Sequence, residues 1–303
     1  MSEQRTIPTQ AWIELFVLAL IWGGSFLAIR LALNEVHFVT SVAHSVFLAA
    51  VILWGYVILR RLPVPRDPKV WFALFVMGVL NNVIPFSLMA WGQLFIPTGL
   101  TSVFNAGTAI FGVIVAALLL ADERLTLRKV VGSAIGFLGV ATAIGLESVR
   151  NFDITSLAQL AVIGGTISYA FASVWARVRL VGLSPQVAAA GMLSGSSLVM
   201  VPAAFVIDGA PSSDISTTAL AAIAYYVIFA TAGAYLLYYR ILAAAGAANA
   251  MIVTLLIPPV SILLGAIALN ESLSPNVYAG LALLALGLVI LDGRVIARYR
   301  KPA

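Results

Sequence analysis

The sequence predicts an all-α integral membrane fold: ten transmembrane helices form two inverted five-helix repeats around a central cavity, with both termini cytoplasmic. Three observations support this prediction. Hydrophobic residues make up 62% of the 303 residues and charged residues 10%, whereas about a quarter of the residues in a soluble domain are charged. The second half of the chain repeats the first, and Lys and Arg are distributed unevenly among the connecting segments.

The predicted spans are stretches of about 20 mostly apolar residues, the length that crosses the hydrocarbon core of a bilayer. Short segments with turn-forming residues separate them, among them RLPVPR at 61–66, IPTG at 96–99 and GAPSS at 209–213. In chain order the predicted spans are 11–33, 38–59, 70–92, 98–120, 127–146, 156–178, 185–207, 218–241, 247–269 and 275–296.

The internal repeat has an offset of 148 residues. Residues 121–126 (ADERLT) align with residues 269–274 (LNESLS) without a gap. Because five helices is an odd number, a tandem duplication must insert the second copy in the opposite orientation. We therefore expect the first repeat in residues 1–152 and the second, inverted repeat in residues 153–303.

The distribution of basic residues predicts the orientation. If the N-terminus is cytoplasmic, all but two of the 17 Lys and Arg residues fall in cytoplasmic segments, the exceptions being Arg30 and Arg150. Basic residues are retained on the cytoplasmic side of bilayers. They also disappear from the hairpin of the second copy, where Asn276 replaces Arg128. We expect a multi-pass protein of the plasma (inner) membrane.

Several classes of function are excluded by what the chain lacks. It has no cysteine and only two histidines, His37 and His44, so we expect no metal site and no cofactor. The basic residues form no aromatic-interleaved stripe, which argues against nucleic-acid binding. No zinc-protease helix, nucleophile elbow or phosphate-binding loop is present, so we expect no enzymatic activity.

One motif near the N-terminus carries a family resemblance. IWGGSF at 21–26, followed by AIR at 28–30, resembles the first-helix signature of the drug/metabolite transporter superfamily, in its EamA-domain branch. The duplicated Glu-x-Leu-Thr/Ser hairpins resemble the C-terminal signature of that domain. The resemblance covers nearly the whole chain as two copies, and it implies a ten-helix permease that exports amino acids or other metabolites.

Charged residues near the spans have both a structural and a functional interpretation. Acidic residues lie mostly at helix ends and none at mid-span, which disfavours a carboxylate proton relay and favours a facilitator or exchanger. We expect Glu123 and Glu271 to cap the helices that follow them, at ~0.3–1 kcal/mol each. Arg30 is better explained by anchoring at the interface than by substrate contact. His44 could sense pH, but a bond to a neighbouring helix explains it better.

Polar and aromatic residues at mid-span are the better candidates for substrate contact. The main alternative for an aromatic residue is a position in the aromatic belt at the membrane–water interface, which could explain Trp91 and Tyr239. For an asparagine it is a bond between helices, at ~0.6 kcal/mol on average. The predicted substrate-binding residues are Trp22, Ser25, Asn81, Asn82, Trp91, Asn105, Tyr169, Trp175, Tyr235 and Tyr239.

Helix breakers and small residues suggest how the helices bend and pack. Pro85 and its repeat mate Gly233, together with Pro258 and Pro259, are predicted hinges. Small residues recur on the fifth and tenth spans, where we expect close helix packing and a scaffold between the halves. These residues are Gly132, Gly136, Gly139, Gly280, Ala282, Ala285 and Gly287.

A cavity walled by Trp, Tyr and Asn without fixed charge suits a neutral or zwitterionic solute that carries an apolar or aromatic side chain. With the resemblance, this predicts a secondary transporter that exports small metabolites, above all neutral amino acids including aromatic ones, by alternating access. Two alternatives remain: an exporter of lipophilic drugs or cations, and a membrane enzyme acting on lipid-linked substrates. The expected partners are a small-molecule substrate and the lipid bilayer, and the sequence is compatible with a monomer.

Overall fold

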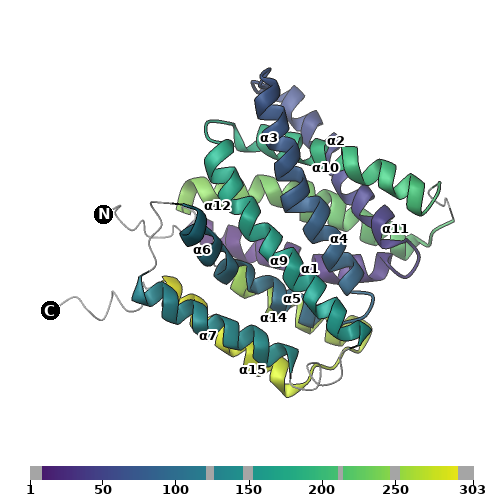
Figure 1. Ribbon diagram of the computed structural model, residues 1–303. Coiled ribbons are helices and arrows are strands. Elements are labelled where there is room, and N and C mark those ends of the chain that lie inside the picture. Colours follow the sequence, from purple (N-terminus) through teal and green to yellow (C-terminus); the bar gives the residue numbers. More distant parts are fainter. Residues whose placement is uncertain (1–8, 121–125, 146–152, 211–213, 246–252, 293–303) are drawn as a thin grey trace.

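The computed structural model describes residues 9–120, 126–145, 153–210, 214–245 and 253–292, and these residues form helices and their connections without a β-strand (Figure 1). The helices coincide with the apolar stretches of the sequence. In chain order they are α1 (Thr9–Ala32), α2 (Phe38–Leu59), α3 (Pro68–Gly78), η1 (Val79–Val83), α4 (Ile84–Gly92), α5 (Thr98–Ala106), α6 (Thr108–Leu119), α7 (Leu127–Ile144), α9 (Ile154–Arg179), α10 (Pro185–Ile207), α11 (Thr217–Ala224), η2 (Tyr225–Gly233), α12 (Ala234–Ala245), α14 (Val253–Leu269) and α15 (Pro275–Asp292).

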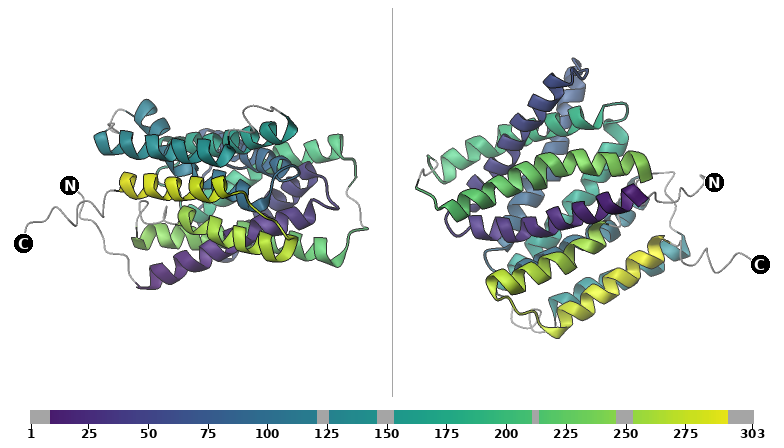
Figure 2. Two further views of the ribbon diagram at one scale, coloured as in Figure 1. Left: turned by 90° about the horizontal axis from the view of Figure 1, so that it is seen from below. Right: turned by 180° about the vertical axis from the view of Figure 1, so that it is seen from behind.

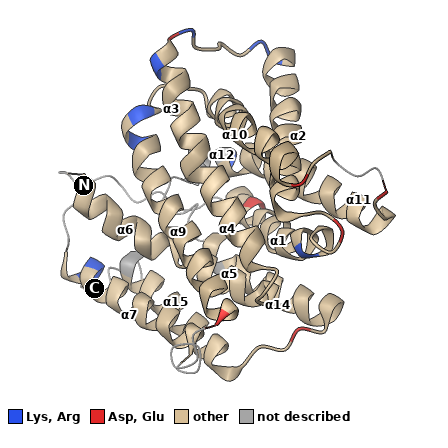
Figure 3. Cartoon of the chain, turned by 45° about the vertical axis from the view of Figure 1, so that its right-hand side comes forward, with Lys and Arg blue, Asp and Glu red and all other residues tan. Residues whose placement is uncertain are grey.

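Eight helical segments of the described chain are long and apolar enough to cross a membrane. Two further apolar segments, Leu256–Leu269 and Pro275–Ile290, are shorter. Figure 3 shows how few charged residues the helices carry along their length. The described part of the chain is thus an all-helical integral membrane fold, while the count of ten spans stays a prediction.

Two of the predicted spans contain a π-helical segment, η1 and η2; the predicted hinge Pro85 lies just after η1, and the predicted hinge Gly233 is the last residue of η2. Pro85 follows η1 and has no N–H, so it leaves a carbonyl of the preceding turn without a helical donor. The Ser168 hydroxyl of α9 donates to the Leu80 carbonyl at 2.7 Å and satisfies it. In η2 the Thr231 hydroxyl donates to the Tyr226 carbonyl at 2.8 Å. The bending role of these hinges stays a prediction.

The largest helix packings join the two halves of the sequence. α2 packs along α10, α1 along α14, and α4 and α6 against α9. The view from behind in Figure 2 shows α1 lying between the α11–α12 segment and α14. The halves therefore interdigitate and share one interior, although the boundary at residue 152 stays a prediction from the repeat.

α7 and α15 pack closely through glycines, as the small-residue pattern predicted. A Cβ atom added to Gly280 would lie 2.6 Å from the carbonyl oxygen of Gly139. One added to Gly287 would lie 2.7 Å from the carbonyl oxygen of Gly132. The backbones approach because these positions have no side chain. The predicted close packing of these two helices is confirmed.

We call the end of the bundle where α1 ends and α2 begins the distal end, and the opposite end the proximal end. At the distal end, acidic side chains cap helices that are remote in sequence. Glu35 accepts hydrogen bonds from the N–H of Ser216 at 2.7 Å and from its hydroxyl at 2.5 Å, at the start of α11. Asp208 accepts from the N–H of Thr40 at 3.0 Å, near the start of α2, and contacts His37 Nδ1 at 2.6 Å.

Glu271 also caps a helix, but not the one we expected from the sequence. Its carboxylate accepts hydrogen bonds from the N–H and the hydroxyl of Thr98, the first residue of α5. The expected cap of the helix that follows Glu271, α15, is therefore wrong, because the side chain reaches across to the first half of the chain. Glu123 lies outside the described residues.

Candidate functional site

A cavity of about 350 Å³ lies between the helices, with walls from both halves of the chain. α1, α2, η1, α4, α5 and α6 contribute residues from the first half, and α9, η2, α12 and α14 from the second. Because each of these helices packs against partners from the other half, the cavity is where the two halves meet. A site of this kind, concave and walled by packed helices, is where a membrane transporter holds its solute.

One wall of the cavity is polar and preorganised. The Asn81 amide of η1 donates to the Tyr235 hydroxyl of α12 at 3.0 Å and to the Asn82 side-chain oxygen at 3.3 Å. Asn82 is fully buried, and its amide lies 3.5 Å from the same hydroxyl. The Tyr235 hydroxyl thus accepts hydrogen bonds from both side-chain amides. Asn105 of α5 and Thr108 of α6 also line the cavity.

A second wall is aromatic. The Trp22 ring of α1 packs against the Tyr238 ring of α12, with 5.8 Å between the ring centroids. The Trp22 indole N–H donates to the Ala230 carbonyl of η2 at 3.0 Å, which fixes the plane of the ring. Tyr169 of α9 also lines the cavity. Such rings offer flat apolar surfaces on which an aromatic or aliphatic side chain can stack.

Small hydroxyl side chains line the distal part of the cavity. The Ser41 and Tyr226 hydroxyls lie 3.2 Å apart, and those of Ser45 and Thr231 lie 3.1 Å apart. The two serines are four residues apart on α2, so they share one face of that helix. The distal part is completed by Gln93, at the end of α4.

The described lining of the cavity carries no fixed charge. None of the described residues that line it is an Asp, Glu, Lys, Arg or His. Arg30 approaches from behind, and its guanidinium donates to the backbone carbonyl of Gln93 at 2.6 Å. A solute with net charge would therefore meet no opposite charge on the cavity wall, and its desolvation would be uncompensated.

The structure brings six of the ten predicted residues together around this cavity. Asn82 lies behind the wall. Trp91 packs against Phe95 at 5.1 Å between ring centroids, away from the cavity lining. Trp175 donates to the Ala73 carbonyl at 2.9 Å, also outside the lining. The side chain of Tyr239 lies outside the described residues. The six that line the cavity are Trp22, Ser25, Asn81, Asn105, Tyr169 and Tyr235.

Sequence reasoning missed several lining residues, of which Gln93 is the most polar. Helical spacing could have found it, because Phe86, Met89, Ala90 and Gln93 repeat at the i, i+3, i+4, i+7 intervals of one helix face. Trp91 falls off that face. The serines of α2 carried no signal, since small hydroxyl residues are common wherever membrane helices pack closely.

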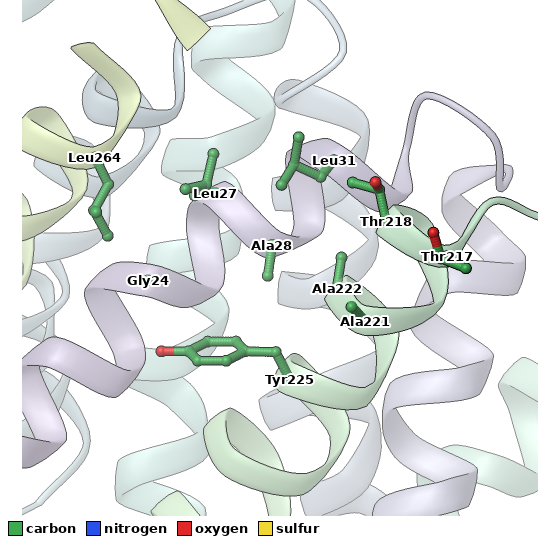
Figure 4. Close-up of a pocket in the computed structure, with 10 residues that line it drawn as sticks. All are labelled: Gly24, Leu27, Ala28, Leu31, Thr217, Thr218, Ala221, Ala222, Tyr225 and Leu264. Atoms are coloured by element: carbon green, nitrogen blue, oxygen red, sulfur yellow. The ribbon is translucent and has the colours of Figure 1, made fainter. Parts of the chain in front are cut away.

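A second, shallower groove lies between α1 and α11, with a volume of about 520 Å³. Figure 4 shows the Tyr225 side chain along its floor, beneath Gly24 and Ala28 of α1. The Tyr225 hydroxyl donates to the Ile21 carbonyl at 3.1 Å. Leucine, alanine and threonine side chains complete the groove, so it offers a solute little polar recognition.

Comparison with known proteins gives the broad function. The EamA-like transporter family matches residues 11–145 and, a second time, residues 156–291. The chain belongs to this family. It is therefore a multi-pass membrane transporter and not an enzyme. The EamA resemblance seen in the sequence is confirmed, and the alternative of an enzyme acting on lipid-linked substrates is excluded.

Individual proteins show how far the similarity extends. An uncharacterized transporter of Archaeoglobus fulgidus is 31% identical over 288 residues, which cover 92% of this chain and 98% of that protein. A probable terminal-alkyne amino-acid exporter of Streptantibioticus cattleyicolor is 24% identical over 214 residues, covering 71% of this chain and 70% of the exporter. A solved crystal structure with 18% identity aligns with a TM-score of 0.69, covering 97% of this chain and 99% of that one, which shows a shared fold.

Proposed function

We propose that this EamA-family transporter exports neutral amino acids, including aromatic ones, by alternating access. The observation that carries the proposal is the uncharged cavity between the two halves, which combines amides and hydroxyls with aromatic rings. An amino acid is zwitterionic at neutral pH and has no net charge, so it matches a cavity without fixed charge. The similarity to a probable amino-acid exporter supports the same solute class.

The two kinds of wall suit the two parts of an amino acid. Amide and hydroxyl groups of Asn81, Asn105 and Thr108 can hydrogen-bond the ammonium and carboxylate groups. The rings of Trp22 and Tyr238 can stack on an aromatic side chain. A lipophilic cation would need a carboxylate in the lining, and the described lining has none, so export of cationic drugs is disfavoured.

We further propose that ten helices span the plasma (inner) membrane as two inverted repeats, residues 1–152 and 153–303, with both termini cytoplasmic. The distribution of Lys and Arg supports this orientation. In this topology the distal end, with Glu35, Asp208 and Glu271, faces outward. The protomer would transport as a monomer, with a small-molecule solute and the bilayer as its partners and without a cofactor.

The first experiment is uptake of labelled phenylalanine, threonine and lysine into proteoliposomes, with and without an imposed pH gradient. We expect saturable flux of phenylalanine and threonine and little flux of lysine, because lysine carries a net charge. Since the described lining has no carboxylate, we expect little response to the pH gradient. Absence of flux for every amino acid, in vesicles that contain folded protein, would overturn the proposed function.

The variant Asn105→Leu tests whether the solute binds in the cavity, since it removes an amide from the lining while keeping the side-chain volume similar. We expect it to lose phenylalanine flux at unchanged protein content in the vesicles. A counterpart outside the lining is Asn276→Leu, which removes an amide that bonds the carbonyls of Thr142 and Ala143. This second variant should lower stability without changing the order of preference among solutes.

A further inference from the structure

Both backbone polar groups of Gln93 make hydrogen bonds, whereas its side-chain amide has no hydrogen-bond partner among the described residues. It ends α4, where its N–H donates to the Met89 carbonyl at 3.0 Å. Its own carbonyl accepts a hydrogen bond from the Arg30 guanidinium at 2.6 Å. Both backbone groups are thus satisfied, and Arg30 neutralises a carbonyl at the negative end of the α4 dipole. The side chain lines the cavity from this fixed position.

The Gln93 side-chain amide is buried and unsatisfied. Its residue is 1% exposed, and neither Nε2 nor Oε1 has a hydrogen-bond partner among the residues that the structure describes. The amides of Asn81 and Asn82 in the same region are both engaged by the Tyr235 hydroxyl. Burying an amide without partners is unfavourable, so a buried amide of this kind requires an explanation. A solute held in this cavity would supply both missing partners.

We propose that the Gln93 side-chain amide binds the zwitterionic head group of the transported solute, with Nε2 donating to a carboxylate oxygen and Oε1 accepting from an ammonium. This inference rests on the proposed amino-acid substrate and deepens it. A side-chain amide presents a donor and an acceptor about 2 Å apart, which matches adjacent carboxylate and ammonium groups. Gln93 is thereby a specificity-determining residue that selects solutes carrying both groups.

The uncharged lining strengthens this assignment. A bare amine or a bare carboxylate would bring a net charge into a cavity whose described lining has no counter-ion. A zwitterion brings two charges that partly compensate each other, and an amide can bond both at once. The charge of Arg30 is already directed to the Gln93 backbone carbonyl, so the neutral side chain is left to recognise the solute.

The principal test replaces the amide with an apolar group of similar shape, Gln93→Met. We expect the KM for phenylalanine uptake into proteoliposomes to rise roughly 10- to 100-fold, the equivalent of about one hydrogen bond to a charged group. The maximal rate should change much less, because the lost interaction contributes to binding. The melting temperature without solute should stay the same or rise, since an unsatisfied buried amide has been removed.

A matched control is Gln159→Met, which makes the same replacement at a buried glutamine of α9 outside the cavity lining. It should leave the KM for phenylalanine within about twofold of wild type. If Gln93 were merely structural, Gln93→Met would lower the melting temperature and would leave the KM unchanged, and that combination would overturn the inference.

A second variant, Gln93→Glu, should change the preference among solutes in a predictable direction. Its carboxylate can accept from an ammonium but repels a carboxylate. The panel is phenylalanine, phenethylamine, which lacks the carboxylate, and 3-phenylpropionate, which lacks the ammonium. Wild type should prefer phenylalanine over both, and Gln93→Glu should shift the preference toward phenethylamine by tenfold or more. An unchanged order of preference in Gln93→Glu would overturn the inference even if Gln93→Met does not fold.

The outcomes separate this inference from the proposed function. If wild type transports phenylalanine and the Gln93 variants keep its KM and its solute preference, the assignment of Gln93 fails while amino-acid export stands. If wild type transports none of the amino acids, the proposed function fails, and the assignment of a zwitterionic head group fails with it. If wild type transports phenylalanine and both variants shift as described, both conclusions are supported.

Discussion

The carboxylate of Glu271 caps α5 at its first residue, Thr98. It accepts a hydrogen bond from the Thr98 N–H at 2.9 Å and one from the Thr98 hydroxyl at 2.7 Å. The two residues are 173 positions apart and belong to different halves of the chain. The contact satisfies N–H groups that a helix start leaves without intrahelical partners, and it places negative charge at the positive end of the α5 dipole.

Replacing Glu271 by glutamine should therefore destabilise the protein by roughly 1–2 kcal/mol, because both hydrogen bonds lose their charge assistance. The measurement is the apparent melting temperature in detergent. Glu14→Gln serves as the control: Glu14 pairs with the exposed Arg240 at the proximal end, where such a pair contributes less than about 1 kcal/mol. Equal loss in the two variants would contradict the special role of the Glu271 cap.

A second distal cap predicts a pH dependence. Hydrogen bonds from the Ser216 hydroxyl and backbone N–H lower the pKa of Glu35 from its ordinary value. A carboxylate with a lowered folded-state pKa stabilises the fold fully above its unfolded pKa, and this stabilisation is lost as the pH falls through the folded pKa. The melting temperature of wild type should thus fall on acidification from about pH 5 to pH 3.

The variant Glu35→Gln cannot titrate, so its melting temperature should fall less over the same pH range. At pH 7 it should melt below wild type, because the ionised cap is missing. Parallel melting curves for the two proteins between pH 5 and pH 3 would show that Glu35 is not responsible. Asp67→Asn is a suitable second control, since Asp67 caps α3 locally through the Lys69 N–H.

The positions of the helices could be read from the sequence, but the faces that they present could not. Apolar residues cover every side of most of these helices, so no polar stripe marks the side that faces the cavity. Trp22 and Trp91 were both predicted to contact the solute, with the interfacial belt as the alternative for Trp91, and the packing of α1 and α4 places only Trp22 on the cavity. Glycine was more informative, because Gly132 and Gly139 recur one repeat later as Gly280 and Gly287, a pattern that predicted the close packing of these two spans.

Contacts between halves were the least predictable features. The π-helical segment η1 depends on Ser168, which lies 88 residues from the Leu80 carbonyl that it satisfies. The cap by Glu271 likewise depends on a partner in the other half. No local sequence pattern around Ser168 or Glu271 predicts which residue it bonds. Helical spacing places Gln93 on one face with Phe86 and Met89, but its unpaired side chain becomes evident only in the cavity that several helices build.

The close approach of α7 and α15 gives a third prediction. Gly287→Ala should destabilise the protein by about 1–3 kcal/mol, because the added Cβ would lie 2.7 Å from the Gly132 carbonyl oxygen and force the helices apart. Gly112→Ala in α6 is the matched control, since its Cβ would meet nothing within 4 Å. That change should be neutral or stabilise by about 0.5–1 kcal/mol. Melting temperatures in one detergent compare the two, and a loss of similar size in both would contradict the packing argument.

The amide cluster at Tyr235 predicts a loss of both stability and transport. Tyr235→Phe removes the hydroxyl that receives Asn81 at 3.0 Å and lies 3.5 Å from the buried Asn82 amide. Leaving the buried Asn82 amide without this partner should cost about 1–3 kcal/mol, and Asn81, which then keeps only its bond to Asn82, should bind phenylalanine more weakly. Tyr56→Phe, outside the cavity lining on α2, should leave flux unchanged. Wild-type KM in Tyr235→Phe would argue against this wall as a solute contact.

The two tryptophans provide the sharpest comparison between the sequence and the structure, because the same substitution can be made at both. Trp22 lines the cavity and packs on Tyr238, whereas Trp91 packs on Phe95 outside the lining. Trp22→Phe keeps a ring but loses the indole N–H bond to the Ala230 carbonyl, so the ring is no longer held in place. We expect the KM for phenylalanine to rise about fivefold or more, the effect of losing roughly 1 kcal/mol of binding. Trp91→Phe should leave that KM within about twofold of wild type.

Since both variants keep an aromatic ring in a membrane helix, a general effect on folding should alter them alike. A larger KM increase in Trp91→Phe than in Trp22→Phe would show that the solute binds elsewhere than in the central cavity.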